Sequence, residues 1–503
     1  MKAENGTPKP STKRSELKRM KHWLLVLLCS LSLIGWSQER ERTLIHIEHA
    51  NQFHKTASSE AVRLLGNVHI RHDSTHFYCD SAYYYEKRNS FDAFQNVHIK
   101  INDSIDMYSR TMSYDGDRRF AEFFDEVRMK DDSTLLETEY MTYDRNLHLA
   151  SYPNHGVTTR GDKRLVSEIG FYRDDMKEFR FFKKVVVTSP KYQMFTDTLY
   201  YNTRMDMMWF QGGGLMKNEN NQEIVADSML YDCEKHFSKA LKNIQITDTA
   251  YKVILRGDYG EIWEKQGLSL ATDSAYAVYY DQGDSLYIAA DTMFYHFKSE
   301  LNKEELVIGR RHVRFFREDM QGQCDTMIYN MADSTIRMRT DPVLWTDQSQ
   351  LTGDFIDIKA AHQSIDSIIQ RGNAFIISED SIEGYNQIKG NDMVSKLLDG
   401  SLHHVNVNGD AITITWLRED DGALIGINKS TSPKMLILME DQSISRIKHY
   451  GATEETLYPE KDLKDNDRLL EGFLWREEER PKSKEEIFLM RNAEFGTAKP
   501  STK

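Results

Sequence analysis

Apolar residues recur along this chain with a period of about 29 residues. Each period contains a short run in which alternate residues are apolar, as in Val68-His69-Ile70 and Val97-His98-Ile99. Such alternation predicts a strand with one buried face, and a fixed period of this size indicates stacked copies of one supersecondary unit. The apolar centres of these runs lie at residues 68, 97, 127, 157, 185, 215 and 244, and then at 313, 343, 374 and 405.

A second motif repeats in step with the first, an acidic residue followed by small, apolar and tyrosine residues. Two copies are Cys79-Asp80-Ser81-Ala82-Tyr83 and Ala226-Asp227-Ser228-Met229-Leu230-Tyr231. Clusters of Asp, Asn, Gly and Lys separate the alternating segments, as is typical of turns between strands. The two motifs together predict an elongated all-β fold, built as a stack of twenty or more short strands shared between two facing sheets. The acidic members fall at 80, 139, 168, 197, 227, 325 and 354, with Arg110 in the equivalent place near 110.

The first 37 residues have the pattern of a signal peptide. Basic residues precede an apolar stretch over residues 23–34, and Gly35-Trp36-Ser37 has the small residues of a cleavage site. Twelve apolar residues are too few for a membrane-spanning helix, which needs about 20. Because Met20 begins a more ordinary signal peptide, the residues before it are interpreted as a possible upstream extension.

The rest of the chain is predicted to contain two repeat blocks and a tail. The first block covers residues 38–249, and the second covers residues 250–450 and ends in a β cap. We place the boundary near 250 because the repeat phase slips between the centres at 244 and 313. Residues 451–503 are rich in charge and are predicted to form a partly disordered tail.

Charge and cysteine content narrow the class of protein. Residues 1–37 contain seven Lys or Arg and two Asp or Glu, so their removal changes the net charge from −13 to −18. An acidic exported chain is poorly suited to binding nucleic acid. Cys79, Cys233 and Cys324 remain. Three dispersed cysteines exclude a disulfide-dense scaffold, although one bridge remains possible, and we expect them to be small buried strand residues.

No catalytic residue, cofactor site or metal site is predicted. The repeated acidic residues lie in register, whereas an active site is a unique constellation, so we interpret them as turn formers and edge charges. His69 and His72 would point to opposite faces of a strand and could not bind one metal together. Gly212-Gly213-Gly214 lacks the Lys-Ser/Thr of a phosphate loop and is expected to replace a Gly-Asn turn, leaving Leu215 as the apolar centre.

The combination of these motifs resembles the OstA/LptA-like (organic solvent tolerance) family of periplasmic lipopolysaccharide-transport proteins. The match is Gly66-Asn67-Val68-His69-Ile70 with Cys79-Asp80-Ser81-Ala82-Tyr83, and later Ala226-Asp227-Ser228-Met229-Leu230-Tyr231-Asp232. The resemblance is most specific over residues 60–250. It implies a folded-over β-jelly roll, a β-taco whose two stacked sheets enclose an apolar trough for the acyl chains of lipid A.

On this interpretation the protein is a periplasmic, non-enzymatic carrier of lipopolysaccharide, and an association with the outer membrane is compatible with that role. Its implied partners are lipopolysaccharide and other transport components or further copies of itself, joined by strand addition at the two open ends. Alternate side chains of the repeated runs would project to one face and line the trough. These candidate lining residues are Val68, Ile70, Val97, Ile99, Val127, Met129, Val185, Val187, Leu215, Ile244 and Ile246.

Two other hypotheses remain open from the residues alone. A closed β-solenoid with a filled core would use the same valines as a structural scaffold. A polysaccharide-degrading β-helix enzyme would need a cluster of residues that breaks the repeat, and residues 250–312 are the candidate location for it.

Overall fold

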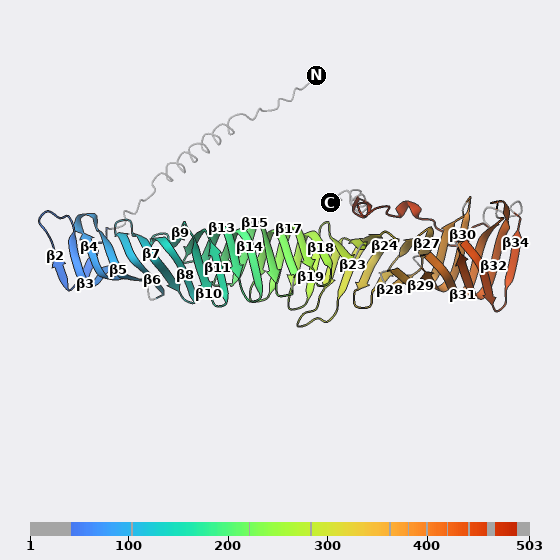
Figure 1. The fold of residues 1–503 in the computed structure, drawn as a ribbon, viewed down its shortest axis with the longest axis horizontal. Coiled ribbons are helices and arrows are strands. Elements are labelled where there is room, and N and C mark those ends of the chain that lie inside the picture. The colour runs from blue at the N-terminus through green and yellow to red at the C-terminus, as the bar shows by residue number, and fades with distance from the viewer. Residues whose placement is uncertain are drawn as a thin grey trace, which may run out of the picture.

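The computed structural model describes residues 42–101, 104–220, 222–281, 284–361, 364–380, 382–398, 401–419, 421–440, 443–459 and 468–489. Within these ranges the chain forms one long stack of antiparallel strands, in which the long strands mostly pair with their neighbours in sequence and the short ones, such as β9 and β12, pair across an intervening hairpin (Figure 1). The predicted all-β, repeat-built fold is confirmed. The predicted signal peptide, residues 1–37, lies outside the described residues. No helix within them is long and apolar enough to cross a membrane.

The strands of the first part of the stack are mostly 11 or 12 residues long. They are β1 (His46–His49), β2 (Gln52–His54), β3 (Val62–His72), β4 (Thr75–Tyr85), β5 (Ser90–Ile101), β6 (Ile105–Asp115), β7 (Phe120–Asp131), β8 (Thr134–Asp144), β9 (Leu149–Tyr152), β10 (Gly156–Arg160), β11 (Lys163–Ser167), β12 (Ile169–Arg173), β13 (Glu178–Thr188), β14 (Tyr192–Asn202), β15 (Met207–Asn218), β16 (Gln222–Asp232) and β17 (Phe237–Asp248).

The second part of the stack includes several shorter strands and, close to its end, four longer ones, β29 to β32. Its strands are β18 (Val253–Trp263), β19 (Leu268–Thr272), β20 (Tyr276–Asp281), β21 (Asp284–Ala289), β22 (Thr292–His296), β23 (Leu306–Arg317), β24 (Met320–Asn330), β25 (Thr335–Arg339), β26 (Val343–Thr346), β27 (Ser349–Thr352), β28 (Phe355–Ala361), β29 (Ser364–Glu379), β30 (Tyr385–Leu398), β31 (Ser401–Arg418), β32 (Leu424–Glu440), β33 (Ser443–Tyr450) and β34 (Glu454–Tyr458). Two short 3-10 helices are η1 (Glu86–Arg88) and η4 (Glu477–Glu479).

Each long strand bends in its middle, and the bends fold the sheet over on itself. In β5 the bend consists of Gln95 and Asn96, with φ of 63° and 49°, immediately before Val97. Strand pairing shifts register there, as expected for a bulge. We call the line of such bends the corner. The same paired positive φ angles occur at Gly66-Asn67, Asp125-Glu126, Lys183-Lys184, Gly212-Gly213, Lys242-Asn243, Arg311-His312, Gly372-Asn373 and Gly409-Asp410.

The two halves of the folded sheet pack against each other across an apolar interior. Phe77 lies in one half, and its ring centroid is 5.2 Å from that of Phe91 and 4.7 Å from that of Tyr114 in the other half. Cys79, Cys233 and Cys324 are buried free thiols, as expected from the sequence. The interior is therefore a continuous core that runs along the stack.

The repeated acidic residues brace the corner. Asp80 lies opposite the bend of β3, and its carboxylate accepts a hydrogen bond of 2.8 Å from the side-chain amide of Asn96 on the next bent strand. Asp227 accepts an equivalent bond of 2.8 Å from Asn243. This periodic structural use explains why the acidic residues recur in register.

The strand pairing runs without a break past residue 250, because β17 pairs with β18 along its whole length. The slip in the repeat phase comes mainly from the loop over residues 297–305. This loop has nine residues, whereas the turns at 203–206, 233–236 and 264–267 on the same side of the sheet have four each. Residues 250–312 thus continue the stack and do not interrupt it.

Residues 468–489 run back along the outer face of the second part of the stack (Figure 1). We call this segment the strap. Two glutamine side chains hold its backbone: Gln387 donates to the Arg468 carbonyl and accepts from the Leu470 amide, both at 2.8 Å. Gln350 bonds in the same way to Leu474 and Arg476, both at 2.7 Å. The strap also buries an apolar cluster of Phe375, Ile377, Ile414, Trp416, Ile427 and Leu470.

The corner geometry predicts the effect of substitutions at Gly213. Its φ is 97°, and a Cβ atom built there meets no heavy atom within 4 Å, so any cost is conformational. We expect Gly213→Val to lower the free energy of unfolding by about 1–3 kcal/mol, because a β-branched residue is strained at positive φ. Gly213→Asn should cost less, since Asn67, Asn96 and Asn243 hold the same place in other repeats. Urea denaturation of both variants tests this, and equal losses would contradict it.

Candidate functional site: the apolar interior and its polar seam

The residues predicted to line a trough face the interior, with one exception. Each follows a corner bend directly or lies two residues beyond it, so alternation directs its side chain inward. All ten are almost fully covered by neighbouring side chains, at 0–2% exposure, so this part of the interior is closed to solvent. They are Val68, Ile70, Val97, Ile99, Val127, Met129, Val185, Val187, Ile244 and Ile246.

Leu215 is the exception, and the expectation that it faces inward is corrected. Gly212 and Gly213 do replace the usual bend, but the next residue inward is Gly214. A Cβ atom on Gly214 would lie 2.7 Å from the ring of Phe210, which fills that space. Leu215 pairs with Phe195 on the outer face, and Met216 takes the inward position. Because Gly214 takes the position that a valine holds in other repeats, Leu215 lies one residue further along the strand and faces the opposite side of the sheet.

Tyrosines that the sequence analysis did not assign make up much of the interior. A tyrosine recurs four residues after the acidic step, and its ring is buried while its hydroxyl lies near one margin of the sheet. Strict alternation would place the fourth residue after an outward carboxylate on the outer face, but the bend at the carboxylate reverses the alternation and turns the second and fourth residues inward. The deeply buried members are Tyr114, Tyr143, Tyr172, Tyr201, Tyr231, Tyr295 and Tyr329.

Hairpin turns line up along the two long margins of the folded sheet, which we call the first and second lips. The first lip includes the turns at residues 73–74, 132–133, 161–162 and 249–252. The second lip includes the turns over 116–119, 145–148, 174–177, 203–206, 233–236 and 264–267. Neighbouring turns of the second lip are joined by backbone hydrogen bonds, for example from the Thr203 amide to the Lys177 carbonyl at 2.9 Å.

The two lips meet along a line of polar side-chain contacts, which we call the seam. Tyr172 of the second lip donates to Asp131 of the first lip at 2.5 Å, and Lys177 pairs with the same carboxylate at 2.5 Å. Further along the stack, Lys163 pairs with Asp206 at 2.9 Å. Each contact joins residues 41 to 46 positions apart, which is about one and a half repeats. The seam therefore repeats with the fold.

The same seam extends in both directions from these central contacts. Tyr295 donates to Asp248 at 2.7 Å in the second part of the stack. Toward the N-terminal end, Tyr114 accepts a hydrogen bond from Arg145 and donates to His72, both at 2.7 Å. Burial lowers the pKa of His72, which favours the neutral ring that can accept this bond. The seam thus satisfies polar groups at the margin of an otherwise apolar interior.

Burial at the seam also raises the pKa values of carboxyl and phenol groups. Burial, followed by the hydrogen bond to Asp131, raises the pKa of Tyr172 well above its usual value, so the phenol stays a donor. Burial raises the pKa of Glu264 to about 7. Tyr231 donates to one of its oxygens at 3.4 Å, while its Oε1 has no hydrogen-bond partner among the described residues. Tyr172 therefore stays protonated, whereas Glu264 exchanges its proton near neutral pH.

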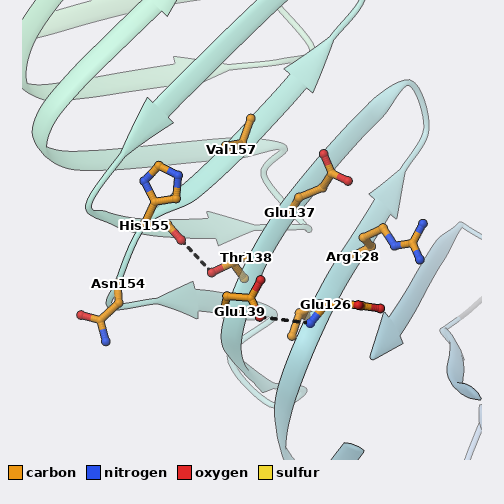
Figure 2. Close-up of a pocket in the computed structure, with 9 residues that line it drawn as sticks. Glu126, Arg128, Glu137, Thr138, Glu139, Asn154, His155 and Val157 are labelled. Carbon is orange, nitrogen blue, oxygen red and sulfur yellow. Dashed lines mark hydrogen bonds between the residues drawn. The ribbon is translucent and has the colours of Figure 1, made fainter. Parts of the chain in front are cut away.

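Surface hollows lie outside the corner, away from the seam. One, of about 420 Å³, is lined by carboxylates of Glu126, Glu137 and Glu139 together with His155 (Figure 2). Figure 2 shows Thr138 donating to the His155 carbonyl at 2.8 Å and the Glu126 amide donating to Glu139 at 3.4 Å. These contacts are part of the corner bracing, and the charged residues around the hollow make it unsuited to acyl chains.

The histidines near residue 70 lie on opposite faces, as predicted. His69 stacks on Tyr78 on the outer face, with ring centroids 4.6 Å apart, whereas His72 is buried at the seam. Across the part of the chain that the structure describes, no group of three or more His, Cys, Asp or Glu could hold a metal ion.

The folded-over sheet with its repeated corner motif can be compared with known protein families. Residues 42–197 match the family model of OstA-like proteins. The resemblance inferred from the sequence is confirmed there. The corner bends continue beyond residue 197 with the same geometry.

Solved and curated proteins add one further comparison. The structure is similar to the crystal structure of LptH from Pseudomonas aeruginosa, which is described as the LptA homologous periplasmic component of the conserved lipopolysaccharide transport device. The two share 14% sequence identity over 28% of this chain and 95% of that chain, with a TM-score of 0.23. No curated protein matches this chain.

The seam contacts predict the cost of removing a tyrosine hydroxyl. Tyr172→Phe leaves the buried Asp131 carboxylate without one of its donors, so we expect the free energy of unfolding to fall by about 1–3 kcal/mol. Tyr200→Phe is the matched control, because Tyr200 lies on the outer face and stacks on Trp209. Chemical denaturation measures both, and equal stability of the two variants would contradict the role assigned to the seam.

Glu264 predicts a specific dependence of stability on pH. Its pKa is about 7 in the fold and about 4.5 in the unfolded chain, so the folded state retains the proton between these values. Its contribution to stability therefore falls as the pH rises from about 4.5 to 7, by up to about 3 kcal/mol. We expect Glu264→Gln to be more stable than the parent at pH 8 and equal to it at pH 4. The control is Glu137→Gln, at an exposed position, and parallel pH profiles for Glu264→Gln and the parent would refute the assignment.

Proposed function

We propose that this chain is a non-enzymatic periplasmic protein that binds lipopolysaccharide and carries it toward the outer membrane through its interior. The observation that carries the proposal is the continuous apolar lining that repeats along the stack, beginning in the OstA-like region. The resemblance to lipopolysaccharide-transport proteins supplies the class of ligand. Acyl chains are the part of lipopolysaccharide that such a lining can hold.

The repeat gives the lining a property that suits transport. Each buried methylene group of an acyl chain contributes about 0.8 kcal/mol. Successive rungs such as Val97/Ile99 and Val127/Met129 present nearly the same surface to the lipid. A bound chain can therefore move from rung to rung with little net change in free energy.

We also propose that the two ends of the stack take part in assembly. At the N-terminal end, β2 has all three of its residues exposed. At the other end, four of the five residues of β34 are exposed. Edge strands of this kind can pair with a strand of another chain, which supports end-to-end joining with transport components or with a second copy.

A closed structural scaffold is the second candidate. The near-complete burial of the lining residues favours it, since a filled core needs no ligand. The two candidates differ in whether lipid ever reaches the interior.

Photo-crosslinking in intact Gram-negative cells that export the protein distinguishes the two. We expect a photo-reactive residue at Val97 or Val185 to form lipopolysaccharide adducts, because both side chains face the interior. His98 and Val186 are matched controls, since each is the next residue on the same strand and faces outward. Adducts at the interior positions alone support the carrier. Their absence in folded, exported protein would favour the scaffold.

A further inference from the structure

We propose that acyl chains enter the interior sideways, through the seam between the lips around the Asp131 and Lys163 contacts. This inference rests on the proposed function, because it names the route by which the same ligand reaches the same interior. It explains how a closed interior can take up a lipid whose polar head is too large and too hydrated to be buried.

The seam is the side of the tube that can part without breaking strand pairing. At the corner the backbone itself passes from one half of the sheet to the other, so the two halves cannot separate there. Across the seam, the contacts between described residues of the two lips are made through side chains. The backbone bonds between turns run along the second lip and not across to the first. Parting the lips therefore leaves every strand paired.

Some ion pairs at the seam are already in contact with water, whereas the Asp131 carboxylate is 1% exposed and must exchange its buried donors for water when the lips part. The side chains of Lys163 and Asp206 are 15% and 28% exposed, so solvent already reaches this ion pair. Those of Arg119 and Asp73, which pair at 3.0 Å, are 25% and 28% exposed. Ion pairs with access to water contribute little net stability, because the separated charges are well solvated. The larger cost of opening is exposure of apolar side chains, and an inserted acyl chain offsets that cost by covering them.

The corner provides the line about which the lips can separate. Strand register shifts at every bend, for example between Phe94 and Val97, so pairing on the two sides of the corner is independent. Each half of the sheet remains hydrogen-bonded as a unit on its own side. A small change at the paired positive-φ residues of several strands would widen the distance between the lips.

At the N-terminal end of the seam an additional segment of chain lies between the lips. Ile45 is 4% exposed and lies between the lips, and its amide donates to the side chain of Asn89 at 2.9 Å. Thr43 bonds to His72 at 2.7 Å and accepts from Arg119 at 3.2 Å. Residues 42–45 thus fill the seam at this end of the stack. The central contacts, where the lips meet directly, are the place where the lips can part.

Spin labels on the two lips test this route. Asp162 and Arg204 lie in exposed turns on opposite lips, beside the Lys163–Asp206 pair, and neither makes that pair. Cysteines at both positions can be labelled in the mature chain, because Cys79, Cys233 and Cys324 are buried. The control pair is Arg118 and Asn146, which lie in neighbouring turns of the same lip. The interlabel distance is measured by pulsed electron paramagnetic resonance before and after addition of purified lipopolysaccharide.

The same samples carry the photo-reactive residue at Val185, so that lipid binding is read independently. We expect lipid adducts together with a longer distance, by several ångströms, between positions 162 and 204, and no change between positions 118 and 146. Adducts without lengthening would overturn the sideways route and place uptake at the ends of the stack, while the proposed function would stand. A lack of adducts would contradict the proposed function, and the sideways route, which depends on it, would be rejected as well. Equal lengthening of both pairs would indicate general loosening and would also overturn the route.

Discussion

The fold depends on one backbone constraint, the bend that carries each strand from one half of the sheet to the other. Two consecutive residues at positive φ cost conformational free energy unless they are glycine or asparagine, and the chain accepts this cost at each repeat. Where other residues occupy the bend, as at Lys183 and Lys184, neighbouring carboxylates such as Glu168 stabilise it through a charged hydrogen bond of 2.6 Å. Without the bend the apolar faces would lie open on a flat sheet, and neither the interior nor the seam would exist.

The seam satisfies the polar groups that the bend brings together on the opposite side of the folded sheet. Two sheet margins that meet over an apolar core must pair their polar groups or leave them buried without partners. A tyrosine suits this place, because its ring packs in the core while its hydroxyl reaches the margin. Tyr172 and Tyr295 each bind a carboxylate of the other lip in this way. The molecule is thus closed by its backbone on one side and by side chains on the other.

Much of the architecture could be predicted from the sequence because the pattern is local. Alternation around Val97 or Val185 fixes which residues point inward, and the glycine and asparagine bends mark where each strand folds. Leu215 was misplaced because a third glycine moved the alternation by one residue, and only the volume of Phe210 reveals which glycine takes the valine position. The seam could not be predicted, because partners such as Asp131 and Tyr172 are 41 residues apart and their meeting depends on the offset of strands across the closed tube.

The strap has a consequence for how the molecule responds to stress. In a stack where each strand contacts only its neighbours, unfolding can begin at any rung and stop a few rungs later. From Leu470 to Phe488 the strap reaches strands as distant as β30 and β20, through Gln387 at one end and the ring of Tyr276 at the other. Strands β20 to β30 are therefore held together both by pairing with adjacent strands and by their shared contacts with the strap. We therefore expect the strands held by the strap to unfold together under force. The strands of the first part, which the described residues of the strap do not contact, can unfold one at a time.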